Sequence, residues 1–286
     1  MNYKTLLAAL LLLVVLTGCS DKYTKVSDSN AVVMTIGNVE VKKSQLYGFL
    51  VANDGANQTL DAVMNHITEQ NIERTAELEE EAKENLKNLK SALGDEFASF
   101  IKGYGYDTEE AYYEEVVLYN ARNAKLVAKY IETKFDTLAL TQKPRKVQVI
   151  EIADKDKAKT ASDKINAGEA YSVVGKEFGS TSFYGKEEIL TSGSSLDPVV
   201  LNKILNTTSP TLYKEIIEGE KGKFYLVNVI EGDPEKFKAE AIEALANNTS
   251  ISDEATRHFL KEAGFKLYDK SIYNQLKQTA PDLIFD

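Results

Sequence analysis

The spacing of apolar residues changes twice along this chain, and that change limits the folds open to it. Residues 31–135 and 234–286 carry apolar side chains at helical spacing, whereas residues 146–152 alternate as a strand does. The helical spacing is clearest at Leu60, Val63, Met64 and Ile67. The sequence therefore predicts an α+β protein with helical flanks around a middle region that contains an antiparallel sheet.

The middle region, residues 144–233, predicts the order β-α-α-loop-α-β-β, with its second strand at residues 212–217. The final 53 residues, 234–286, are too few to form a good core alone. We expect them to pack on the first helical segment. Residues 31–143 and 234–286 would then form one helical domain, with residues 144–233 inserted into it.

Turn and cap residues refine the helical flanks. Gly37-Asn38 predicts a hairpin turn between two short strands. Asp107, with Glu110 three residues later, predicts the N-cap of one long helix that runs to about residue 134. Ser252 predicts the N-cap of a helix that ends before Gly264.

The N-terminus has the pattern of an export signal. Lys4 precedes an apolar run of 11 residues from Leu6 to Leu16, which is shorter than the roughly 20 residues that span a bilayer. Leu16-Thr17-Gly18-Cys19 resembles the lipobox of bacterial lipoproteins, which implies acyl chains, palmitate among them, on Cys19. Residues 1–18 would be the signal peptide and residues 19–30 a flexible tether. The alternative is an ordinary signal peptide with an incidental cysteine.

Composition excludes several classes of protein. The net charge is −10, which argues against nucleic acid as a partner because phosphate binding needs basic patches. Cys19 is the only cysteine, so an intramolecular disulfide is excluded, and acylation of its thiol would exclude thiol catalysis as well. The two histidines, His66 and His258, have no metal-site spacing or catalytic-triad motif around them, and we interpret both as structural or surface residues. No cofactor motif is present, and no cofactor or metal is predicted.

The order of these features resembles the PrsA-type foldase lipoproteins of bacteria, with the periplasmic chaperone SurA more distant in architecture. The resemblance rests on the lipobox, the opening Val33 to Lys43, the middle region and the helical tail. Residues 105–110, 177–181 and 259–267 are similar to further stretches of that family. The family implies a helical crevice that holds unfolded exported proteins and a parvulin domain that isomerises X–Pro bonds. Uncatalysed isomerisation takes tens of seconds or more, so it can limit folding.

The chain departs from the family at the catalytic histidines. Parvulins place two histidines on adjacent central strands, and the matching positions here hold Val149 and Tyr225. Leu196 and Val200 match the apolar residues of the family's proline pocket, so the resemblance implies substrate binding by these four side chains. Valine cannot form a hydrogen bond, and a phenol titrates near pH 10. We therefore assign no catalytic residue and expect isomerase activity to be weak or absent.

The leading hypothesis is a lipid-anchored foldase and chaperone on the outer face of the cell membrane, with unfolded exported proteins as partners. The resemblance favours a Gram-positive envelope and leaves a homodimer open. The alternatives are an active peptidyl-prolyl isomerase and a surface lipoprotein that binds one envelope partner. Five tyrosines between residues 104 and 119 either line a client surface or, as we favour, pack between helices: Tyr104, Tyr106, Tyr112, Tyr113 and Tyr119.

Overall fold

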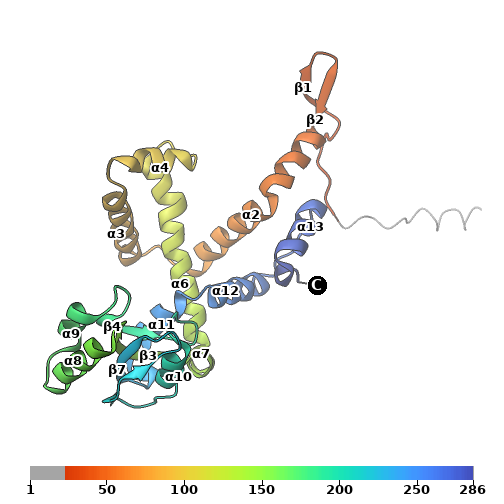
Figure 1. Ribbon diagram of the computed structural model, residues 1–286. Coiled ribbons are helices and arrows are strands. Elements are labelled where there is room, and N and C mark those ends of the chain that lie inside the picture. Colours follow the sequence, from red (N-terminus) through yellow and green to blue (C-terminus); the bar gives the residue numbers. More distant parts are fainter. Residues whose placement is uncertain (1–22, 286) are drawn as a thin grey trace, which may run out of the picture. The chain divides into compact units, whose positions relative to one another are not determined.

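The structure is a computed structural model that describes residues 23–285 (Figure 1). The predicted signal peptide, Cys19 and the first residues of the tether lie outside this range. Two compact units divide the chain: Met1–Ile67 with Arg257–Asp286, and Thr68–Thr256. The second unit holds the middle region together with several helices of the flanks. The predicted domain boundaries near residues 143 and 233 are a different division and stay a prediction.

The first unit contains the predicted hairpin, β1 (Val32–Ile36) and β2 (Val39–Lys42), which pair antiparallel. Its turn is at Gly37, whose φ of +61° favours glycine. The helices of this unit, two of which continue into the other unit, are α2 (Lys43–Asn71), α12 (Thr249–Glu262), α13 (Lys270–Thr279) and the 3₁₀ turn η4 (Pro281–Leu283). The predicted N-cap at Ser252 is wrong, because α12 already begins at Thr249.

Hydrogen bonds hold the C-terminal segment against α2 within the first unit. The Tyr47 hydroxyl donates to Asp269 Oδ2 over 2.8 Å. Gln275 donates to the carbonyl of Val51 over 2.7 Å and accepts from the amide of Ala56 over 3.1 Å. Chain segments more than 200 residues apart in sequence therefore form one unit.

The second unit begins with helices that surround a core of their own. They are α3 (Ala76–Leu93), η1 (Gly94–Glu96), α4 (Phe97–Gly103), α5 (Glu109–Tyr112), the π-helical turn η2 (Tyr113–Val117), α6 (Leu118–Thr133) and α7 (Phe135–Gln142). The prediction of one long helix capped by Asp107 is wrong in two respects. Thr108 is the N-cap, because its backbone is extended and its side chain accepts from the Ala111 amide. The helix is also interrupted by η2.

The C-terminal flank packs on the first helical segment, as the short tail requires. It contributes η3 (Pro234–Phe237) and α11 (Lys238–Ala246). Phe237, Ala241 and Leu245 share a buried cluster with residues of α6 and α7, including Ile131 and Phe135. Since all five side chains are at most 7% exposed, this contact closes a core that neither segment could form alone.

The middle region has a twisted antiparallel sheet with helices on both faces. Its elements are β3 (Arg145–Ile152), α8 (Lys155–Asn166), α9 (Tyr171–Phe178), β4 (Tyr184–Leu190), α10 (Pro198–Leu205), β5 (Thr211–Leu212), β6 (Ile217–Glu218) and β7 (Phe224–Glu231). The strand order is β4-β3-β7-β5, and β6 also pairs with β7. The predicted strand at residues 212–217 is therefore wrong, because only its two ends pair with β7.

Alternation along β3 sends successive side chains to opposite faces of the sheet. Ile150 and Ile152 lie with α8 and α9 in one buried cluster. Val147 and Val149 lie with α10 in another. The strong apolar alternation of this strand thus reflects burial on both faces, and only the α10 face carries the residues that the sequence assigns to a site.

The connections into and out of the middle region meet at Arg145. Its side chain is 6% exposed, and its guanidinium donates to the carbonyls of Pro144, Leu205 and Thr207 over 2.6–2.9 Å. Gly232 lies so close that a Cβ there would be 2.4 Å from the carbonyl carbon of Thr208. These contacts hold the start of β3 and the end of β7 against the end of α10 and the loop that follows it.

Candidate functional site

The four residues predicted to bind substrate lie together on the α10 face of the sheet. Val149, Val200 and Tyr225 are buried in one cluster, and Leu196, just before α10, packs against it half-buried. They come from β3, α10 and β7, and from the loop before α10. The structure therefore brings the predicted pocket residues into one place, and their binding of a substrate stays a prediction.

Burial decides what this cluster can contact. Val149 and Val200 are 0% exposed, and Tyr225 is 2% exposed. On the sheet, Val149 is opposite Val227, and Tyr225 is opposite Glu151. A prolyl ring from solvent cannot reach the Val149 side chain in this arrangement. The position that the sequence resemblance matches to a parvulin histidine is here part of the hydrophobic core.

Tyr225 has a polar partner that the sequence reading did not single out. Its hydroxyl donates to Glu151 Oε2 over 2.9 Å, and Lys223 Nζ is 2.7 Å from Glu151 Oε1. The Glu151 side chain is 14% exposed. The phenol of Tyr225, which the sequence resemblance matches to the second histidine, therefore already donates its hydrogen bond to a carboxylate of this chain.

The electrostatics of this group follow from burial and from its partners. Burial opposes ionisation of Glu151, but hydrogen bonds from Lys223 and Tyr225 outweigh it and hold its pKa below the usual value. Burial, together with the hydrogen bond to Glu151, raises the pKa of Tyr225. At neutral pH the pair is thus a neutral phenol that donates to an ionised carboxylate, and neither group is poised to exchange protons.

A turn between β6 and β7 covers the edge of the Tyr225 ring. A Cβ at Gly219 would be 2.8 Å from the ring carbon Cε2 and 2.6 Å from Asp197 Oδ2. Asp197 fixes this turn, because Oδ2 accepts from the amide of Glu220 over 2.8 Å while Oδ1 caps α10 through Val199. Only glycine fits at position 219, and the turn closes the site from that side.

Glu188 on β4 is a second acidic group on this face of the sheet, opposite Val147. Its Oε1 atom is buried and has no hydrogen-bond partner within residues 23–285. Burial raises the pKa of this carboxyl. An ionised carboxylate without a hydrogen-bond partner is costly in this buried position. Apart from its alternating position on the strand, nothing in the sequence indicated the role of Glu188.

Both histidines belong to the first unit, whereas this site belongs to the second. His66 is exposed on α2, and His258 lies on α12, with Nε2 3.6 Å from a Glu262 carboxylate oxygen. Within the described range, no three residues of metal-binding type are grouped as a metal site would require. Likewise, residues 23–285 contain no helix with the length and hydropathy of a membrane span.

The tyrosines near α5 mainly pack between helices. Tyr112 is 7% exposed, and its ring makes edge contacts with Phe97, Phe100 and Tyr106. Tyr104, by contrast, is 68% exposed. Tyr112 therefore packs between helices, which is the interpretation that we favoured. The five rings together do not form one client surface.

No protein-family model and no curated protein matches this chain. The solved structures that match it include PrsA foldases, the family that the sequence resembles. The foldase PrsA of Streptococcus pneumoniae is 17% identical, and the match covers 87% of this chain and 99% of that one with a TM-score of 0.48. PrsA of Bacillus cereus, described as a peptidylprolyl isomerase, is 18% identical over 88% and 99%, with a TM-score of 0.44. PrsA of Bacillus subtilis is 20% identical over 88% and 99%, with a TM-score of 0.42.

Proposed function

We propose that this chain is an extracytoplasmic chaperone of the foldase type, in which the parvulin-like middle region no longer isomerises prolyl bonds at a useful rate. The observation that carries the second part is the burial of Val149 together with the hydrogen bond from Tyr225 to Glu151. Isomerisation needs polar groups that reach the substrate amide. At the two histidine positions, one side chain is apolar and sealed, and the other is already paired.

The chaperone part is supported by apolar surface in the first unit. Ile36 and Val39 on the hairpin are 65% and 64% exposed, and Phe49 on α2 is 66% exposed. Val32, Val33, Met34, Leu46 and Leu50 are exposed as well. Exposed apolar side chains gathered on one hairpin and on the helix that follows it mark an interaction surface, and unfolded chains are the partners that offer matching apolar segments.

Two assays on the purified protein test the proposal. In the first, the protein is mixed at stoichiometric ratio with a chemically unfolded exported protein, and light scattering follows aggregation. We expect suppression, and a protein that suppresses no client would refute the chaperone assignment. In the second, isomerisation of a proline tetrapeptide is followed. A parvulin-level rate would show instead that the chain is an isomerase, and Leu196→Asp/Val200→Asp should then abolish that rate.

Anchoring through Cys19 belongs to the same proposal, and it rests on the lipobox-like residues alone. We expect the exported protein to partition with membranes and to carry acyl chains, since two or more chains give a stable anchor. Cys19→Ser should release it into the soluble fraction. Metabolic labelling with an alkyne palmitate, followed by detergent partitioning, measures both properties. A Cys19→Ser protein that stays with membranes would contradict the anchor.

A further inference from the structure

A groove runs between α3 and the α5–η2 segment, within the second unit. Two adjoining cavities of about 480 and 350 Å³ form it, and they share Lys83, Leu86 and Glu109 as lining residues. Along α3 the lining residues follow helical spacing, so they form one stripe: Lys83, Leu86, Lys87 and Lys90. Across from them are Glu109, Glu110, Tyr113 and Glu114. We call this feature the α3–α5 groove.

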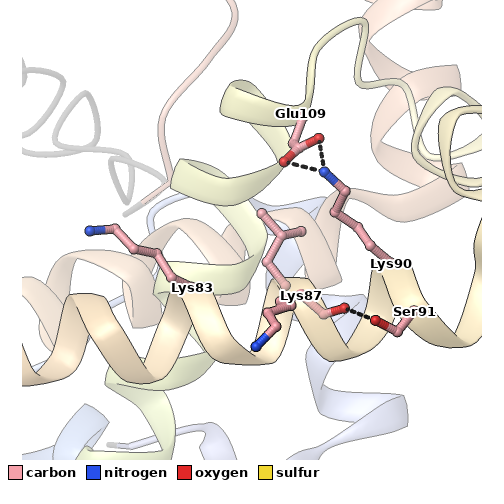
Figure 2. A pocket seen from close by; sticks show the side chains of 6 residues that line it. Lys83, Lys87, Lys90, Ser91 and Glu109 are labelled. Carbon is pink, nitrogen blue, oxygen red and sulfur yellow. Dashed lines mark hydrogen bonds and ion pairs between the residues drawn. The ribbon is translucent and has the colours of Figure 1, made fainter.

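The walls of the α3–α5 groove carry opposite charges. Lys83 and Lys87 extend from α3 with side chains 57% and 72% exposed, and each pairs with a glutamate three residues before it. Exposed pairs of this kind are weak and exchange readily. Figure 2 shows Lys90 reaching across to Glu109, with a shortest Nζ–carboxylate distance of 2.7 Å. One wall is therefore basic. On the other wall Glu109 is paired with Lys90 and Glu114 with Arg74, so Glu110 is the carboxylate that has no ion pair among the described residues.

The floor of the groove is apolar and contains one unmet hydrogen-bond donor. Leu86 is 8% exposed and belongs to the core beneath. The hydroxyl oxygen of Tyr113 is buried and lacks a hydrogen-bond partner among the residues that the structure describes. Tyr113 is also the first residue of the π-helical turn η2, and such turns occur frequently at functional sites. A buried hydroxyl without a partner is costly unless a ligand supplies an acceptor.

The dimensions suit a short extended peptide better than a helix. Lys83 and Lys90 are seven positions apart, which is about 10 Å along a helix and about three residues of extended chain. An extended backbone has free carbonyls that can accept from the Tyr113 hydroxyl. A helix has already used its carbonyls and would leave that hydroxyl unpaired.

We propose that the α3–α5 groove binds a short extended segment of an unfolded client, with one apolar residue between an acidic and a basic residue. The apolar side chain lies against Leu86, the acidic side chain pairs with Lys83 and Lys87, and the basic side chain pairs with Glu110. A backbone carbonyl accepts from Tyr113. This inference rests on the chaperone function proposed above and adds a binding site and a sequence preference to it.

Fluorescence anisotropy on the full chain in detergent micelles tests the groove. The probe is a labelled heptapeptide, Gly-Ser-Asp-Leu-Lys-Ser-Gly, and its neutral counterpart has Asn and Gln in place of Asp and Lys. We expect the charged peptide to bind at least about fivefold more tightly, since two exposed ion pairs contribute that order of affinity. Lys83→Glu/Lys87→Glu should lose about that factor. The matched control is Lys155→Glu/Lys159→Glu on the exposed face of α8, which changes net charge equally and should leave affinity within about twofold.

Tyr113→Phe removes only the hydroxyl and should weaken binding severalfold without destabilising the fold. Equal loss in the groove variant and in the α8 variant would overturn the proposal, because it would mean a general charge effect. So would tighter binding of a helix-stapled form of the peptide, or unchanged binding in Lys83→Glu/Lys87→Glu. If the unmodified protein suppresses client aggregation while these variants bind the peptide normally, the groove assignment fails and the chaperone function stands. If the unmodified protein suppresses no aggregation, the chaperone function itself fails.

Discussion

Replacing Tyr225 by phenylalanine is the sharpest test of the closed site. The substitution keeps the buried ring and removes the hydroxyl that donates to Glu151 over 2.9 Å. A hydrogen bond to a charged acceptor contributes about 1.5–3 kcal/mol to stability. Lys223 remains as a partner of the carboxylate at 2.7 Å. We therefore expect Tyr225→Phe to lower the free energy of unfolding by about 2 kcal/mol at pH 7.

The loss should depend on pH with a definite sign. The pKa of Glu151 is lowered in the folded protein from a usual value of 4.5. A lowered carboxyl pKa stabilises the fold above the unfolded value, and that contribution disappears as pH falls through the folded pKa. The Tyr225→Phe penalty should accordingly be largest at neutral pH and shrink in acid, once Glu151 is protonated.

Urea unfolding followed by circular dichroism at pH 7 and about pH 3 measures both effects. Tyr213→Phe is the matched control, because the Tyr213 hydroxyl is 2.6 Å from the neutral Thr207 hydroxyl. It should cost about 1 kcal/mol at either pH. The reasoning is refuted if Tyr225→Phe costs no more than Tyr213→Phe at pH 7, or if its penalty is the same at both pH values.

Three further variants test the second unit. Val149→His/Tyr225→His should not restore isomerase activity in a proline tetrapeptide assay and should destabilise the fold by about 3 kcal/mol, since position 149 is fully buried. Glu188→Gln should stabilise the protein by about 1 kcal/mol at pH 7 in urea unfolding. Because the folded pKa of Glu188 is raised, its penalty arises above the unfolded value of 4.5, so the gain should vanish in acid. Arg145→Met should lower the unfolding free energy by about 3 kcal/mol, because the carbonyls of Leu205 and Thr207 would lose their charged hydrogen-bond donor.

Local patterns predicted much of the middle region and fewer of the helix boundaries. The alternation of residues 146–152 corresponds to β3, and the two helices predicted after it correspond to α8 and α9. The helix after residue 107 was predicted with the wrong cap, because Asp107 and Thr108 are both good caps and only the backbone geometry of Thr108 selects between them. The π-turn η2 has no signature in apolar periodicity. Helix α13 was not predicted at all, although its apolar residues and the Asp269 cap carried a usable signal.

The candidate site shows the same limit at the level of side chains. The resemblance to the foldase family singled out Val149, Leu196, Val200 and Tyr225 as site residues. In the structure these side chains lie in one cluster. Glu151 escaped attention because a carboxylate on an alternating strand is usually solvent-facing, and its partner on β7 is 74 residues away in sequence. Parity alone puts it on the same face as Val149. Pairing register, which the sequence does not reveal, was needed to connect it with Tyr225.

The closed site and the single cysteine have a common physical consequence. A chain without an intramolecular disulfide must obtain its stability from packing. A working isomerase pocket keeps polar groups desolvated, reachable and incompletely packed, which costs stability. Here the same face of the sheet contains fully buried Val149 and Val200, and the phenol of Tyr225 is tied to Glu151. Under the function proposed above, packing this face of the sheet as core would stabilise the middle region, and the exposed apolar side chains of the β1–β2 hairpin and the α3–α5 groove would be the surfaces for clients. Loss of catalysis and retention of client binding would then be separable, because the two would depend on different residues.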